Sequence, residues 1–296
     1  MDGDGSIQVN HWKKRSLQYR LVIKLKNTEV NGLMLKEISD VVGGHVRQIK
    51  GFVLWVENHK AQIQKIISIF EIYPPLTTRL QCQLIYLKRF LHCASGFPRF
   101  LIKDRKKGLP QSKGNSLFLT KTVSDKKKDN DLIRVESYLK ERPFKYDNVL
   151  LLRHSMAKEN LLRRSYFKEW LSGFIEAKGC FSIRKSGDSS FSISQKTDYY
   201  LLENIRNYFG AVNMVRILKE KTLPHFSTKK IDVELTKEPL QLQKEPFQPF
   251  HKVEDLFLLE VYRKESFKKI IEHCLLYPLL GEKRISFEIF VSNCKV

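Results

Sequence analysis

Hydrophobic and polar residues alternate along two neighbouring stretches near the start of the chain, "SIQVNHW" and "YRLVIKLK". Because the side chains of a strand point alternately to opposite faces, each stretch predicts a strand with one apolar and one polar face. The apolar face comprises Ile7, Val9, Leu21, Ile23 and Leu25. A helical pattern, "GLMLKEISDVVGG", follows, and then come a strand, "FVLWVE", and a second helix, "AQIQKIISIF". This order is typical of an α+β protein with antiparallel strands.

The same order of elements returns in the second half of the chain. Segment 176–294 matches segment 2–91, with "EAKGCFSI" aligned to "DGDGSIQV" and "YPLLGEKRI" aligned to "YPPLTTRLQ". A repeat on this scale indicates duplicated structural units. We predict two pseudo-symmetric repeats of outline αββαββα, in which one strand is faint, near 45–49 in the first repeat and 212–218 in the second.

The repeat sets the predicted domain boundaries. The first repeat covers 1–94, and the second covers 161–296 with a polar, proline-containing insertion at about 217–250. Between them, 95–160 contains charge runs with turn residues, "KDRKKGLPQSKGNS" and "SDKKKDND". This composition predicts a flexible basic linker whose apolar clusters can dock on the repeats.

The charge of the chain favours a polyanionic partner. Lys and Arg number 53 against 32 Asp and Glu, which gives a formal net charge of +21. Because the excess is spread along the chain, it indicates nucleic acid and no membrane partner, and no apolar run approaches the roughly 20 residues of a membrane span. The five cysteines form no Cys-x-x-Cys pair, which argues against a zinc site or a disulfide framework.

Outward strand residues are the candidates for nucleic-acid binding. Alternation places a set of polar and basic residues opposite the core in the two repeats, namely Gln8, Asn10, Arg20, Lys24, Arg184, Lys185, Ser192, Ser194 and Lys196. One such face alone is ordinary solvent exposure. Repeated in both halves of a strongly basic chain, it indicates a surface for base and phosphate contacts.

Two short motifs carry a family resemblance. "LSGFIEAKG", Leu171 to Gly179, resembles the nine-residue motif of the LAGLIDADG homing endonucleases and group I intron maturases. "DGDG", Asp2 to Gly5, resembles the last four positions of the same motif, and the two "YP" endings are similar to the family's closing segment. The resemblance covers roughly 1–91 and 166–294.

The resemblance implies a monomer whose two repeats form a saddle of antiparallel sheets over the major groove of double-stranded DNA. The two motif helices would pack together at the centre, and an acidic residue at the end of each would bind a divalent metal, usually Mg²⁺, at the cleavage site. By position, Asp4 is the expected catalytic residue and metal ligand of the first repeat. Some members instead assist the splicing of their own group I intron RNA.

The matching position in the second repeat holds Lys178. A carboxylate at a helix C-terminus opposes the macrodipole at a cost of about 0.3–1 kcal/mol, so an acid there needs a compensating cation. An ammonium suits the macrodipole and cannot ligate metal, so Lys178 is predicted to impair the catalytic centre, although it can contact phosphate. Glu176 is the remaining catalytic candidate, but two residues along a helix is about 200° around its axis, so its carboxylate should point elsewhere.

The sequence begins at the fifth position of the first motif, so most of the helix that the resemblance implies ahead of Asp4 is not in it. Two explanations stay open: a reading frame that continues upstream of Met1, and a gene in decay.

Two functions follow. One is an intron-encoded homing endonuclease that binds a long DNA site for Mg²⁺-dependent double-strand cleavage, with an impaired centre. The other is a non-enzymatic maturase that binds its own group I intron RNA. A composition rich in Lys, Ile, Leu and Phe suits an AT-rich organelle genome, and the resemblance favours a mitochondrion, with a chloroplast as the alternative.

Overall fold

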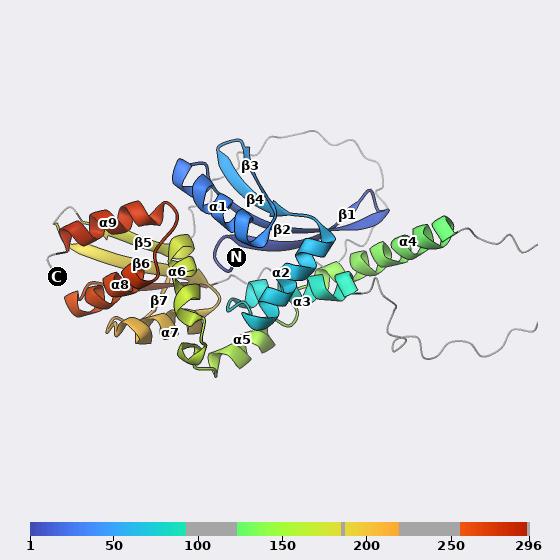
Figure 1. Cartoon of the computed structure of the whole chain (residues 1–296). Coiled ribbons are helices and arrows are strands. Elements are labelled where there is room, and N and C mark those ends of the chain that lie inside the picture. Colours follow the sequence, from blue (N-terminus) through green and yellow to red (C-terminus); the bar gives the residue numbers. More distant parts are fainter. Residues whose placement is uncertain (93–122, 185–186, 219–254, 295–296) are drawn as a thin grey trace, which may run out of the picture.

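The computed structural model describes residues 1–92, 123–184, 187–218 and 255–294. Two four-stranded antiparallel sheets, each packed against helices, form the two halves of the molecule (Figure 1). The strand order is β1-β2-β4-β3 in the first sheet and β5-β6-β8-β7 in the second. The predicted α+β fold with two pseudo-symmetric repeats is confirmed. None of the helices in these ranges combines the length and the apolarity that a bilayer crossing needs.

The first repeat keeps the predicted alternation of its strands. Ile7 pairs with Leu21 across β1 and β2, and both side chains are buried. The faint strand predicted near 45–49 is β3, which pairs with β4. In chain order the elements are β1 Gly5–Trp12, β2 Ser16–Lys26, α1 Glu29–Val42, β3 His45–Ile49, β4 Phe52–Glu57, α2 Lys60–Ile72 and α3 Thr78–His92.

The second repeat begins with the helix α6 and then has the same order of elements as the first. Its faint strand is the three-residue β7, and the part of the predicted insertion beyond it, 219–250, lies outside the described residues. Each repeat ends on two helices, one more than the predicted outline. The elements are α6 Phe167–Lys178, β5 Gly179–Ile183, β6 Ser189–Lys196, α7 Tyr199–Phe209, β7 Arg216–Leu218, β8 Leu256–Val261, α8 Lys264–Leu276 and α9 Lys283–Asn293.

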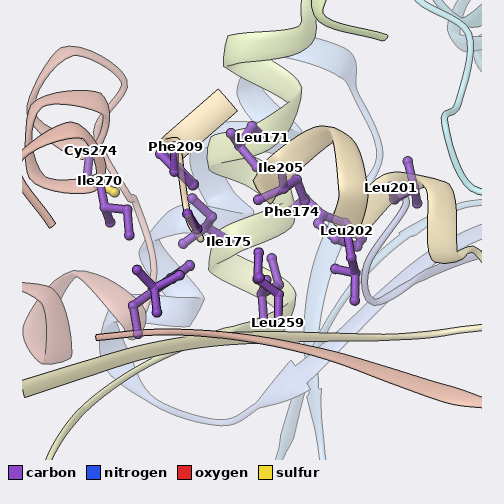
Figure 2. Close-up of a cluster of buried hydrophobic side chains, with 14 of the residues drawn as sticks. Leu171, Phe174, Ile175, Leu201, Leu202, Ile205, Phe209, Leu259, Ile270 and Cys274 are labelled. Carbon is purple, nitrogen blue, oxygen red and sulfur yellow. The ribbon is translucent and has the colours of Figure 1, made fainter. Parts of the chain in front are cut away.

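Helix α6 anchors the second repeat through its apolar stripe. Leu171, Phe174 and Ile175 stand at i, i+3 and i+4, which places them on one side of the helix. All three are buried in the core of their own repeat, where Ile205 of α7 and Leu259 of β8 join them (Figure 2). Because this stripe faces the second sheet, the opposite side of α6 remains for contacts with the first repeat.

The described part of the predicted linker is largely helical rather than a flexible coil. Its elements are α4 Val123–Glu141, the short 3₁₀ turn Arg142–Phe144 and α5 Val149–Ala157; a second 3₁₀ turn, Leu161–Arg163, stands at the start of the second repeat. Tyr138 of α4 is buried in the core of the first repeat, and Met156 of α5 is buried in that of the second. Arg134 adds a hydrogen bond to the carbonyl of Phe90 at 2.7 Å. The apolar residues among the charges thus dock this segment on both repeats, whereas the boundaries 95–160 stay a prediction.

His273 of α8 is a buried neutral histidine behind α6. The hydroxyl of Ser172 donates to the carbonyl of Tyr277, so it accepts from His273 Nε2 at 3.1 Å, which leaves Nδ1 to accept from the Tyr208 hydroxyl at 3.2 Å. Burial, and to a smaller extent the charge of Lys168, lowers the pKa of His273 to about 4.

The protein is therefore expected to lose stability as the pH falls from about 6.5 to about 4. In that interval the unfolded state binds a proton at His273 that the folded state does not, so the free energy of unfolding decreases, by up to about 3 kcal/mol over the interval. His273→Gln, which keeps one donor and one acceptor, should flatten the slope of stability against pH there. Urea unfolding across this pH range checks the prediction, and an unchanged slope in the variant would contradict it.

Candidate nucleic-acid interface

Each sheet begins directly after a closing helical turn. The N–H of Gly179 donates to the carbonyl of Ile175, which ends α6. The N–H of Gly5 donates to the carbonyl of Met1 over 2.8 Å, so residues 1–5 form the matching turn ahead of β1. Both atoms of the bond are shifted by the same 174 residues (175 − 1 and 179 − 5), as the sequence alignment predicts. We call these two turns the motif tips.

The two motif tips touch each other. Gly3 packs so closely on α6 that an added Cβ would lie 2.1 Å from the Cβ of Ala177. This close approach explains why small residues occupy both positions. Gly173, a small residue four positions earlier in α6, has no atom of another element within 4 Å of the place where its Cβ would be.

Lys178 and Asp4 lie side by side at the end of the tips. The Lys178 Nζ donates to Asp4 Oδ1 at 3.1 Å, and the two side chains are 31% and 30% exposed. The structure thus brings together the two residues that the repeat alignment matches. An ammonium neutralises the carboxylate at the place where the family resemblance implies one metal-binding acid from each repeat, as expected from Lys178 in the second motif.

The acidic residues two positions earlier in each tip cap helices. Glu176 accepts hydrogen bonds from two backbone N–H groups at the start of α9, at 3.0 and 3.1 Å. Asp2 accepts from the N–H groups of Leu76 and Thr77 ahead of α3, both at 3.0 Å, and from Trp170 Nε1 at 2.8 Å. Backbone N–H groups at a helix start lack partners within the helix and favour a nearby anion. Glu176 therefore points away from Lys178, as its helical position predicts.

We call the place where Asp4 and Lys178 meet the centre. Its residues do not fit a Mg²⁺ site built from two carboxylates. Asp4 supplies one carboxylate, and the ammonium that lies against it repels a cation. In the part of the chain that the structure describes, no three His, Cys, Asp or Glu side chains are grouped so that they could hold a metal ion. In this structure the negative charge of Asp4 is balanced by the ammonium of Lys178.

Two polar contacts across the repeats were not apparent from the sequence. Asp198, at the start of α7, accepts from the N–H and the hydroxyl of Thr78 at 3.0 and 2.5 Å, with Arg153 Nε at 3.8 Å. Burial raises the pKa of Asp198, and the hydrogen bonds from Thr78 oppose that rise. In the matching place, Asn31 of α1 accepts from the N–H of Glu282 at 3.2 Å. In the sequence, Asp198 and Asn31 are recognisable only as polar residues near the start of a helix. This position does not reveal that their partners lie in the other repeat.

The outward face of the first sheet carries the predicted polar residues. Gln8 and Arg20 are directly paired across β1 and β2, so they lie on the same face. Asn10 and Lys24 are exposed, and the Lys24 Nζ lies 3.8 Å from the centre of the Phe52 ring. This face combines cations, amides and an aromatic ring, which are side chains that contact phosphates and bases.

The outward face of the second sheet has a different chemistry. Arg184 follows β5, and its guanidinium lies 4.4 Å from the centre of the Tyr262 ring. Lys185 lies outside the described residues. The predicted positions that alternate with the buried residues of β6 are Ser192, Ser194 and Lys196. Hydroxyls therefore outnumber cations along β6, so the two sheets offer different contacts to a bound polymer.

Comparison with known proteins agrees with the geometry. Residues 1–89 and 171–237 match the family model described as LAGLIDADG endonuclease. The chain is 35% identical over 296 residues to the probable intron-encoded endonuclease aI3 of Dictyostelium citrinum, and the match covers 98% of this chain and 90% of that protein. A protein of the same description from Debaryomyces hansenii is 35% identical over 98% of this chain, which spans 36% of that protein's length. The LAGLIDADG homing endonuclease I-GzeII, solved in complex with its DNA target, shares the fold, with a TM-score of 0.56, 16% identity and coverage of 98% of this chain and 86% of that one.

Proposed function

Because the chain belongs to the LAGLIDADG endonuclease family, we propose that it binds a long double-stranded DNA site across its two sheets, as a monomer, with a centre impaired for cleavage. The observation that supports an impaired centre is the ion pair of Lys178 and Asp4 at 3.1 Å. Cleavage of both strands with Mg²⁺ would have to rest on a single central carboxylate, and the adjacent ammonium competes for it.

The outward residues supply the contacts for DNA. Arg20 and Lys24 are suited to phosphates and guanine edges, whereas Gln8 and Asn10 are suited to adenine edges. The serines of β6 can donate to or accept from either kind of group. The net charge of +21 provides the long-range attraction that brings a polyanion to these faces. Lys185 completes the proposed set.

A second function, an RNA maturase for the group I intron that encodes the protein, is favoured by the same ion pair. Folding an RNA needs a basic surface and does not need two central carboxylates. The name of the Dictyostelium citrinum relative, an intron-encoded endonuclease, agrees with an intron as the source of the gene. A mitochondrion is the proposed location, with a chloroplast as the alternative. The amino-acid composition, rich in Lys, Ile, Leu and Phe, suits a gene in an AT-rich organelle genome.

We expect the purified chain to bind a duplex that contains its intronless insertion site and, in the presence of Mg²⁺, to leave that duplex without a double-strand break. Affinity should fall steeply with salt: the logarithm of the association constant should decrease linearly with the logarithm of the salt concentration, with a slope of about −0.9 for each phosphate contacted. Gel shift and cleavage assays on the same duplex, with a scrambled duplex as control, check both statements.

Two results of these assays would contradict the proposal. A linear product cut on both strands would show that the centre is competent despite Lys178. The second result is equal affinity for the insertion site and the scrambled duplex, together with tight binding of the intron RNA. It would contradict a specific DNA site and support the maturase function.

A further inference from the structure

The ion pair at the centre leaves part of the Lys178 ammonium open. An ammonium has three N–H donors, and within the described residues Asp4 is its hydrogen-bond partner, at 3.1 Å. Nearly a third of the Lys178 side chain is exposed, so it is open to solvent on one side. The pair is therefore both neutral and able to accept one more negatively charged ligand.

The surroundings hold this ammonium in place. The contact between Gly3 and Ala177 presses the two motif tips together, so the end of α6 cannot shift toward β1. The neighbouring carboxylates of Asp2 and Glu176 are engaged by backbone N–H groups of α3 and α9. Asp4 is thus the carboxylate that remains for Lys178.

The centre directly precedes the first strand of each sheet along the chain. In a strand, residues two apart lie on one face, and the outward row of β1 begins with Ser6 and continues with Gln8. The outward row of β5 begins with Cys180, which is exposed and pairs with Ser192. Asp4 and Lys178, which are in contact, stand two residues ahead of Ser6 and Cys180 in the chain, so the outward rows of β1 and β5 begin close to the ion pair. A polymer lying along both faces passes this point.

We propose that the Lys178 ammonium takes the place of a divalent cation at the centre: it neutralises Asp4 and directly binds a backbone phosphate of the nucleic acid. The proposal rests on the proposed function, since it requires a nucleic-acid partner. Two facing carboxylates would need a divalent cation before a phosphate could approach, whereas an acid paired with an ammonium does not. Binding at the centre is therefore independent of divalent metal.

The first test measures Mn²⁺ binding to the protein alone by electron paramagnetic resonance. Wild type and Asp4→Asn should bind Mn²⁺ equally weakly. Lys178→Glu should gain one site, and the double variant Asp4→Asn/Lys178→Glu should lose it. A wild-type site that disappears in Asp4→Asn would overturn the proposal, and this comparison holds even if the Lys178→Glu protein fails to fold.

The second test measures affinity for a mixed-sequence DNA duplex against salt concentration, with EDTA present. Lys178→Met should reduce the magnitude of the slope of log K against log salt by about 0.9, the loss of one phosphate contact. The matched control is Lys168→Met, at the other end of α6 and about 15 Å away along the helix, which should leave the slope unchanged.

An unchanged slope in Lys178→Met, or a wild-type affinity that requires a divalent cation, would overturn the proposal. Thermal unfolding of each variant confirms that it is folded. If the wild type binds no duplex at all, the proposed function fails separately, and the Mn²⁺ comparison still decides whether the ammonium occupies the place of the cation.

Discussion

Asp198→Ala is expected to lower the free energy of unfolding by about 3–5 kcal/mol, because it removes one member of a buried charged network. The carboxylate is 0% exposed and accepts two hydrogen bonds from Thr78 of α3, and Arg153 of α5 lies 3.8 Å away. Without it, the first N–H of α3 loses its partner while it stays in the interior, and the Arg153 guanidinium, whose side chain is 31% exposed, loses the nearby opposite charge. Since the contact joins the second repeat to the first and to the connecting helices, the loss should weaken the whole assembly.

Urea unfolding of matched variants checks this expectation. Asp198→Asn keeps an acceptor oxygen for Thr78 and should be destabilised less than Asp198→Ala. Asp40→Ala removes an exposed carboxylate from α1 and should change stability by no more than about 0.5 kcal/mol. A cost below about 1 kcal/mol for Asp198→Ala would mean that the network across the repeats contributes little.

Gly3→Ala is expected to lower the free energy of unfolding by about 1–3 kcal/mol through overpacking. The new methyl group would lie 2.1 Å from the Cβ of Ala177 and 3.5 Å from its Cα, so one motif tip must move away from the other. The backbone at Gly3 does not have a positive φ, so steric conflict, and not the loss of glycine's conformational freedom, causes the effect.

A second glycine provides the control for this substitution. Gly32 lies within α1 and has no neighbour within 4 Å of the place where its Cβ would be. Gly32→Ala should therefore leave stability unchanged or raise it by up to about 1 kcal/mol, the difference in helix propensity. Thermal or urea unfolding measures both variants. Equal stabilities for Gly3→Ala and wild type would contradict the close contact of the tips.

The repeat pattern predicted most of the fold because alternation and helical periodicity are local properties. The buried residues of β1 and β2 are the ones that alternation predicts, with Ile23 and Leu25 only partly buried. The connecting segment shows the limit of this reasoning. "SDKKKDND" has the composition of a solvated linker, yet it lies within α4, where Val135 and Tyr138 are buried. Charged and apolar residues share this helix, and only the tertiary structure reveals which side is covered.

The centre was partly predictable for the same reason. The duplicated motif predicted that Asp4 and Lys178 would be neighbours, and their ion pair is at 3.1 Å. The capping roles of Asp2 and Glu176 were not predicted, because their partners lie 74 to 107 residues away along the chain. Asp198 was missed for a similar reason, since its partner Thr78 is 120 residues away. Contacts of this range depend on how the repeats dock.

The two motif tips share their helix-capping and packing roles but differ in the charge that they bring to the centre. Asp2 and Glu176 each cap the last helix of their own repeat, and Gly3 and Ala177 each allow the close approach. Only the charge at positions 4 and 178 differs, where the second tip has an ammonium in place of a carboxylate. This replacement removes the repulsion that two facing acids would have and makes the centre neutral without a metal.

The exchange variant Gly3→Ala/Ala177→Gly tests the meeting of the tips most directly. The exchange moves the methyl group from one tip to the other and restores the space between them, at a cost of about 1 kcal/mol for a glycine in α6. Double-mutant analysis of urea unfolding should give a favourable coupling energy of at least about 1 kcal/mol between positions 3 and 177. Additive effects, with a coupling below about 0.5 kcal/mol, would contradict a structure in which the two repeats meet at these residues.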